Sequence, residues 1–151
     1  MIKTNATGRE SLKEMKKREA AEKEVELRKK CEALAFEKYT EDTIKQWSNK
    51  HKGLWYLPVI NDDDSIETMA IMKPIDRHIL SFASTKIEDE GLYTFLEQCM
   101  REVFVAGVEP DGKLSDKADD SVIITDDEYF IPAAMKFNKI MESKKVAFLK
   151  R

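Results

Sequence analysis

The fold class follows from residues 54–73, which read LWYLPVINDDDSIETMAIMK. Both ends of this stretch are rich in the aromatic and aliphatic residues that favour strands, and the polar cluster at residues 61–65 between them is typical of a turn. The pattern therefore predicts a β-hairpin. Pro58 cannot donate a backbone hydrogen bond, so we expect its strand at the edge of a sheet. Because two strands alone are marginally stable, the hairpin must pack against helices or against another chain.

Upstream of the hairpin, the sequence predicts one long helix that begins near Ser11 and continues to about Ser48. Ser11 and Glu14 have the spacing of a capping box. Residues 9–30 carry charges of both signs with almost no apolar stripe, whereas apolar residues recur at helical spacing from Leu27 onward. A helix that is polar on all sides has no core of its own to pack against.

These two patterns divide the chain into two parts. We expect residues 1–30 to form a charged helix that projects into solvent or becomes ordered against a partner. Residues 31–151 should form a single helix-rich domain that contains the hairpin, at about the size of one typical domain.

Downstream of the hairpin, the sequence predicts a short helix and then the best-patterned helix of the chain. Asp76 can cap the short helix. The apolar residues of the short helix are Ile79, Leu80, Phe82 and Ala83. Over residues 92–104, apolar residues recur at i, i+3, i+4 and i+7, and Gly107 suits the position just after a helix end.

The last part of the chain predicts a polar loop and a closing helix. Residues 108–121 are mostly polar and include a turn signal. Thr125 and Glu128 match a second capping box. The apolar residues that follow trace an amphipathic helix, and its regular part should begin near Pro132, because proline is favoured at the first helical position.

Together these elements predict an α+β fold that is mostly α, with a long N-terminal helix, the β-hairpin and three C-terminal helices packed against it. The expected core consists of apolar residues on the inner faces of these elements: Leu34, Trp55, Leu57, Ile71, Leu80, Leu92, Phe95, Leu96, Cys99, Val103, Phe104, Phe137, Ile140 and Met141. Both cysteines, Cys31 and Cys99, fall on apolar helix faces, where a thiol behaves as a small hydrophobe. Free thiols fit a reducing compartment.

Composition favours a soluble intracellular protein and disfavours several classes of partner. The chain has 151 residues, of which 42% are hydrophobic and 36% charged, so it can bury a core and still carry solvated faces. A net charge of −3 does not favour nucleic acid. We expect no membrane partner, because no stretch approaches the ~20 apolar residues of a spanning helix. Residues 1–9 also lack the apolar segment of a secretory signal.

No motif in the sequence predicts a catalytic, metal or cofactor site. The acidic clusters at residues 61–64 and 116–120 lack the ligand pattern of a calcium-binding loop. His51, His78 and the two cysteines do not have the spacing of zinc ligands. A dyad of Cys99 with His78 is disfavoured because Cys99 falls on an apolar helix face, and no glycine-rich phosphate loop occurs. We therefore expect no cofactor and no enzymatic activity.

Six residues are candidates for a protein interface: Lys16, Lys17, Arg18, Trp47, Trp55 and Tyr56. Aromatic residues are enriched at interface anchors, and the alternative is that they pack the hairpin on the long helix. The three basic residues lie in the charged N-terminal segment. There they form either a solvated face of mixed sign or a contact to nucleic acid.

Residues 72–151 also carry the pattern of a known family. An apolar run that ends in Lys73-Pro74 precedes a short helix. Asp89-Glu90-Gly91-Leu92 then opens a helix that runs through Cys99 to Val105-Ala106-Gly107, and a polar loop and a closing helix with a lysine-rich end follow. This segment resembles the small proteins of tailed-phage structural gene clusters, including tail assembly chaperone-like proteins. The resemblance implies a non-enzymatic role in head or tail morphogenesis or as a virion component, and no catalytic residues carry over.

Three hypotheses of function follow. The first is a structural or assembly protein that acts through helix and edge-strand contacts. Its partners would be phage structural proteins or copies of itself, in the host cytoplasm during assembly and in the virion if it stays in the particle. The alternative is a small nucleic-acid-associated regulator that binds through the basic N-terminal helix in a salt-dependent way. The third, a carboxylate-based enzyme, needs a pocket in which acids with perturbed pKa values converge.

Overall fold

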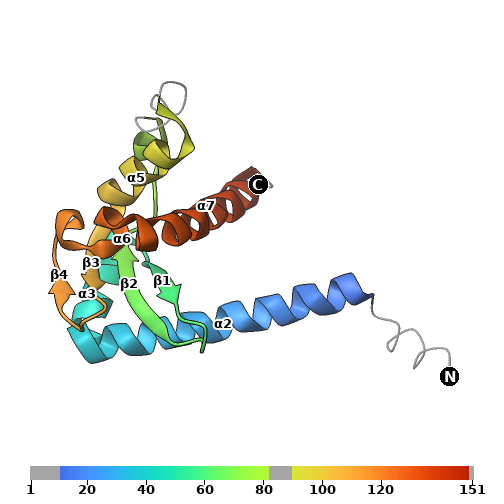
Figure 1. The fold of residues 1–151 in the computed structure, drawn as a ribbon. Helices are drawn as coiled ribbons and strands as arrows, with labels where there is room; N and C mark the ends of the chain where they lie inside the picture. The colour runs from blue at the N-terminus through green and yellow to red at the C-terminus, as the bar shows by residue number, and fades with distance from the viewer. Residues whose placement is uncertain (1–10, 82–89, 150–151) are drawn as a thin grey trace.

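The computed structural model describes residues 11–81 and 90–149 and shows an α+β fold that is mostly α, as the sequence predicted (Figure 1). The helices are α2 (Leu12–Tyr39), α3 (Glu41–His51), α5 (Leu92–Val103), η1 (Ala118–Asp120, a 3-10 helix), α6 (Val122–Thr125) and α7 (Asp127–Leu149). The strands are β1 (Trp55–Ile60), β2 (Ile66–Met72), β3 (Phe104–Val108) and β4 (Leu114–Ser115).

The predicted hairpin is confirmed as the β1–β2 pair of a four-stranded antiparallel sheet with the order β1-β2-β3-β4. Leu57 is paired with Ala70, and the register shifts between Val59 and Ile60, next to the acidic turn. In the described part of the chain β2 is the only neighbour of β1, so β1 is an edge strand, as Pro58 predicted.

Helices cover both faces of the sheet, so the molecule has three layers (Figure 1). Successive side chains of a strand point to opposite faces. Leu57 and Ala70 belong to the buried cluster that includes α5, α6 and α7, whereas Tyr56 and Ile71 belong to the cluster that includes α2 and α3. The hairpin is therefore held from both sides, as its marginal stability alone required.

The first half of α2 projects beyond the sheet. Ser11 Oγ accepts a hydrogen bond from the Glu14 amide at 3.0 Å, which confirms Ser11 as the helix cap. Residues 12–26 are all exposed, and this part of the helix extends away from the strands in Figure 1. Cys31 and Ala35, in the second half, are buried. Packing on the sheet thus begins close to where the apolar pattern begins.

The prediction of one helix to Ser48 is wrong, because the chain breaks at Thr40. Thr40 has φ 70° and ψ 151° and separates α2 from α3. Its Oγ1 accepts a hydrogen bond from the Thr43 amide at 3.3 Å and so caps α3. The turn places Ile44 in the same buried cluster as Cys31 of α2. A helix without this turn would run past the sheet and leave Ile44 in solvent.

The predicted helix of residues 92–104 is followed by a strand that the sequence analysis missed. α5 ends at Val103, and Phe104–Val108 pairs with β2. Gly107 therefore lies in β3 and not at a helix end. A Cβ on Gly107 would lie 2.5 Å from Ser115 Oγ of β4, so the close pairing of β3 with β4 requires glycine there.

The segment predicted as a polar loop, residues 108–121, is more ordered than expected, because it contains β4 and η1. Its organising group is the carboxylate of Glu109. That carboxylate accepts one hydrogen bond from Ser115 Oγ and another from the Val122 amide, both at 2.8 Å. The first ties Glu109 to β4 and the second ties it to the start of α6, so one acidic side chain joins both ends of the segment.

The closing helix begins earlier than predicted. α7 starts at Asp127 and contains Pro132, so the start near Pro132 is wrong. Asp126 Oδ1, and not Thr125, accepts the hydrogen bond from the Glu128 amide, at 3.1 Å. Pro132 is the sixth residue of α7, so the helix lacks the hydrogen bond that an amide at this position would donate to the preceding turn.

The short helix occupies residues 77–81, and Asp76 Oδ1 accepts a hydrogen bond from the Ile79 amide at 2.9 Å, as predicted. Its expected continuation through Phe82 and Ala83 lies outside the described residues, as do residues 1–10.

Most of the predicted core is buried or partly buried. The buried members are Leu57, Ile71, Leu96, Cys99, Val103, Phe137 and Met141, and the partly buried ones are Leu34, Trp55, Phe95, Phe104 and Ile140. Leu80 and Leu92 are exposed, so their assignment to the core is wrong. Residues 77–81 and the first turn of α5 lie beyond the strands in Figure 1, and each packs against the core through another residue, Ile79 or Phe95. Cys31 and Cys99 are buried free thiols, as expected.

Candidate functional site

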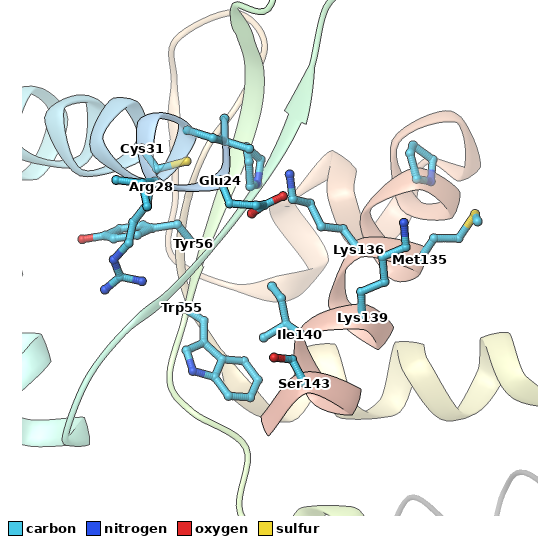
Figure 2. A pocket seen from close by; sticks show the side chains of 14 residues that line it. Glu24, Arg28, Cys31, Trp55, Tyr56, Met135, Lys136, Lys139, Ile140 and Ser143 are labelled. Carbon is cyan, nitrogen blue, oxygen red and sulfur yellow. The ribbon is translucent and has the colours of Figure 1, made fainter. Parts of the chain in front are cut away.

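A groove of about 760 Å³ lies between α2 and α7, with β1 as its floor (Figure 2). Its lining residues are Glu24, Val25, Leu27, Arg28 and Cys31 from α2, Trp55, Tyr56 and Pro58 from β1, and Pro132, Met135, Lys136, Lys139, Ile140 and Ser143 from α7. The groove exists because the two helices pack on opposite faces of the sheet and both extend past its edge strand (Figure 1).

The α7 wall is a second face of a helix whose first face is in the core. The core face carries Phe130, Ala133, Ala134, Phe137 and Met141. The groove face carries Pro132, Met135, Lys136, Lys139, Ile140 and Ser143, which repeat at i, i+3, i+4, i+7, i+8 and i+11 and so share one side of the helix. Met135 is 53% exposed, so this face presents apolar surface beside its lysines.

The floor of the groove is held by packing from both helices. The Trp55 ring lies 6.1 Å from the Phe137 ring of α7, centroid to centroid. The Arg28 guanidinium of α2 lies over the Tyr56 ring, 5.9 Å from its centroid. Burial raises the pKa of Tyr56 above its ordinary value. Trp55 is thus held toward the α7 wall, and its neighbour Tyr56 is held toward the α2 wall.

Basic side chains predominate around the groove. Arg28 comes from α2, and Lys136 and Lys139 come from α7; among the described lining residues Glu24 is the single acid. Figure 2 shows Glu24 and Lys136 pointing toward one another. Three cations against one anion make the groove locally positive, although the whole chain has a net charge of −3.

Cys31 lines the groove, but its thiol is not activated. It is 1% exposed, and burial raises its pKa to about 11, although Lys136 and Arg28 act in the opposite direction. The thiol is therefore protonated at neutral pH and lacks the thiolate that nucleophilic attack requires. Glu24 has no second carboxylate beside it in the described lining. The groove can hold a partner, but its described residues do not form a nucleophile–base pair or a pair of carboxylates.

The structure places the six predicted interface residues in three locations. Trp55 and Tyr56 lie on the groove floor. Trp47 lies on α3 with its ring centroid 5.0 Å from that of Tyr39, in the cluster on the α2 side of the sheet and outside the groove lining. The three basic residues, Lys16, Lys17 and Arg18, are exposed on the projecting half of α2, also outside the lining.

The α7 wall was missed by the sequence analysis, which assigned Ile140 to the core and singled out neither Met135 nor Lys136. A signal was present, because these residues form a second stripe beside the core stripe of α7. The stripe becomes the wall of a groove only because the free edge of β1 lies next to it.

Over residues 11–81 and 90–149, no three His, Cys, Asp or Glu side chains gather closely enough to hold a metal ion. In the same part of the chain, no helix combines the length and the apolarity needed to cross a bilayer.

No protein-family model matches the chain, and comparisons with curated proteins and with solved structures find no match.

Proposed function

We propose that this chain is a non-enzymatic protein-binding protein that holds a segment of a partner protein in the groove between α2 and α7. One observation carries the proposal: exposed apolar side chains from two helices line one groove, beside the edge of β1 that has no strand partner in the described part of the chain. Val25 of α2 is 55% exposed and Met135 of α7 is 53% exposed, and both line the groove. Apolar side chains gathered in a concave site are typical of binding surfaces.

The class of partner follows from the resemblance of residues 72–151 to proteins of tailed-phage structural gene clusters. We propose that the partner is a phage structural protein and that the chain is an assembly factor or a virion component. It would then act in the host cytoplasm during assembly, and in the virion if it stays bound. The exposed half of α2, residues 12–26, is a second surface for the same partner or for another copy of the chain.

Selection of peptides on the full chain tests the binding role. Peptides enriched from a displayed random library should bind the wild-type chain and lose at least about tenfold in affinity when Val25→Asp or Met135→Asp places a charge in the groove. Both side chains are exposed, so neither substitution should unfold the protein. The matched control is Ile131→Asp, because Ile131 is 45% exposed on the same helix and does not line the groove.

Either of two results would overturn the proposal. Either no peptide is enriched, or the enriched peptides bind Val25→Asp and Met135→Asp as tightly as the wild-type chain. The partner class is tested separately by a photo-crosslinking residue at position 135, with position 131 as control, in the cells that make the protein. A phage structural protein joined at position 135 alone supports the class. A cellular protein joined there overturns the class and leaves the binding role standing.

A further inference from the structure

The groove occupies the place that a fifth strand of the sheet would take. The strand order leaves one side of β1 unpaired in the described part of the chain. α2 packs on the sheet face that carries Tyr56, and α7 packs on the face that carries Leu57. The space between the two helices is therefore continuous with the plane of the sheet, and its floor is a strand edge (Figures 1 and 2).

The free edge of β1 presents a defined set of backbone groups. The pairing of β1 with β2 is regular from Trp55 to Val59, and Pro58 within it has no N–H to donate, so its nitrogen faces away from β2. Backbone groups of successive residues alternate between the two sides of a strand. Those of Leu57 therefore point toward β2, and those of Tyr56 and Pro58 point toward the groove. Because Pro58 has no N–H, the edge offers the Tyr56 N–H and the carbonyls of Tyr56 and Pro58.

The charges beside this edge select the chemistry of its occupant. Arg28 approaches from the α2 wall, and Lys136 and Lys139 approach from the α7 wall. Glu24 of α2 points toward Lys136, so cations still outnumber anions by three to one in the lining. Complementary charge steers a partner and rejects one of the same sign. Nucleic acid would meet the same cations, but the lining also includes Val25, Met135 and other apolar side chains, which a phosphate backbone cannot use. An acidic peptide with apolar residues uses both parts of the surface.

We propose that the partner segment is an extended acidic strand that pairs with the free edge of β1. This inference rests on the proposed function, and it names the conformation and the charge of the bound segment. The partner residue opposite Tyr56 directs its side chain to the same face as Tyr56, which is the side of Arg28. Its two neighbours direct theirs to the other face, toward Lys136 and Ile140 of α7.

Three short synthetic peptides, capped at both ends, test the inference with the full chain. The first alternates aspartate and valine, the second replaces each aspartate with lysine, and the third is the first peptide with N-methylated central amides. Isothermal titration calorimetry should show that the first peptide binds and that each of the others binds at least about tenfold more weakly. N-methylation removes the backbone donors that strand pairing needs, and the lysine peptide meets like charge.

Variants of the chain locate the contact. The double substitution Lys136→Glu with Lys139→Glu should weaken the acidic peptide at least about tenfold. The matched control is Lys29→Glu with Lys50→Glu, because both of these lysines are exposed and lie outside the groove lining. Strand pairing itself should slow hydrogen exchange of the Tyr56 amide at least about tenfold, whereas a helical ligand would leave that amide unpaired.

The outcomes separate this inference from the proposed function. Library peptides that depend on the groove but are neutral, or that leave the Tyr56 amide exchange unchanged, would overturn strand pairing by an acidic segment and leave the binding role intact. The absence of any groove-dependent peptide would overturn both. A dimer of the chain that buries the groove, or single-stranded nucleic acid that displaces the acidic peptide from it, would also overturn the inference.

Discussion

Replacing Thr40 with glycine should stabilise the protein, although Thr40 is the cap of α3. Thr40 has φ 70° and ψ 151°, a combination that essentially only glycine adopts without strain. A residue held in such a conformation costs on the order of 1–3 kcal/mol. The Thr40 side chain is exposed, so its removal gives up little packing. Relief of backbone strain is therefore the main effect of the substitution.

Two smaller effects oppose that relief. Thr40 Oγ1 accepts a hydrogen bond from the Thr43 amide at 3.3 Å, and exchanging a threonine cap for glycine costs about a few tenths of a kcal/mol. Glycine also gives the unfolded chain more conformational freedom, which costs roughly 0.5–1 kcal/mol. The balance predicts that Thr40→Gly raises the free energy of unfolding by about 1 kcal/mol.

Urea-induced unfolding followed by far-UV circular dichroism measures this difference, with Thr40→Ala as the matched variant. Alanine loses the cap and keeps the strain, so Thr40→Ala should lower the free energy of unfolding by about 1 kcal/mol. The denaturant dependence should be the same for all three proteins, because the surface exposed on unfolding does not change. If Thr40→Gly proves no more stable than Thr40→Ala, the argument from backbone strain is refuted.

Three further predictions concern the sheet and the buried titratable groups. Gly107→Ala should lower the free energy of unfolding by roughly 1–3 kcal/mol, because its Cβ would lie 2.5 Å from Ser115 Oγ, and urea unfolding should show a smaller loss in a Ser115→Ala background. Tyr39→Phe should cost about 1 kcal/mol in the same assay, because Tyr39 Oη donates a 2.7 Å hydrogen bond to the Gly107 carbonyl. Stability should fall as pH rises from about 9 to about 11, measured by urea unfolding at each pH. Burial raises the pKa of Cys31 and of Cys99 from 9.0 to about 11, so over this range the unfolded thiols ionise while the folded thiols stay neutral.

Each of these has a control. An equal cost of Gly107→Ala in both backgrounds would contradict the clash with Ser115. Tyr93→Phe, at an exposed position of α5, should change stability by less than about 0.5 kcal/mol, and an equal effect at Tyr39 would mean that its hydrogen bond contributes nothing. A chain with Cys31→Ala and Cys99→Ala should lose less stability between pH 9 and 11, and an unchanged slope would assign the loss to other groups.

Secondary-structure elements whose signals lie within a few neighbouring residues could be predicted from the sequence. Strand-forming residues around an acidic turn predicted β1 and β2, and Pro58 predicted which of them lies at the edge. Ser11 marked the start of α2. These predictions depend on backbone propensity, a missing amide hydrogen and a cap, and none of these requires a distant part of the chain.

Elements whose form depends on a distant neighbour were decided by tertiary structure. Phe104–Val108 continues the apolar pattern of α5, yet it forms a strand because β2 offers it a partner edge. The Lys73 amide donates a hydrogen bond to the Val103 carbonyl at 2.9 Å, just where the helix ends. Thr40 likewise interrupts a helical pattern because α3 must turn back to bury Ile44.

The groove combines features that the local sequence predicts with features that only tertiary packing creates. Trp55 and Tyr56 could be recognised from the sequence as aromatic neighbours on an edge strand, and so could the apolar face of the closing helix. The packing of α2 and α7 on the sheet brings Met135 and Lys136 into one groove with Val25 and Arg28, beside the free edge of β1. The faces of a helix follow from residue spacing along the chain, whereas a groove is set by the packing of segments that are far apart in the sequence.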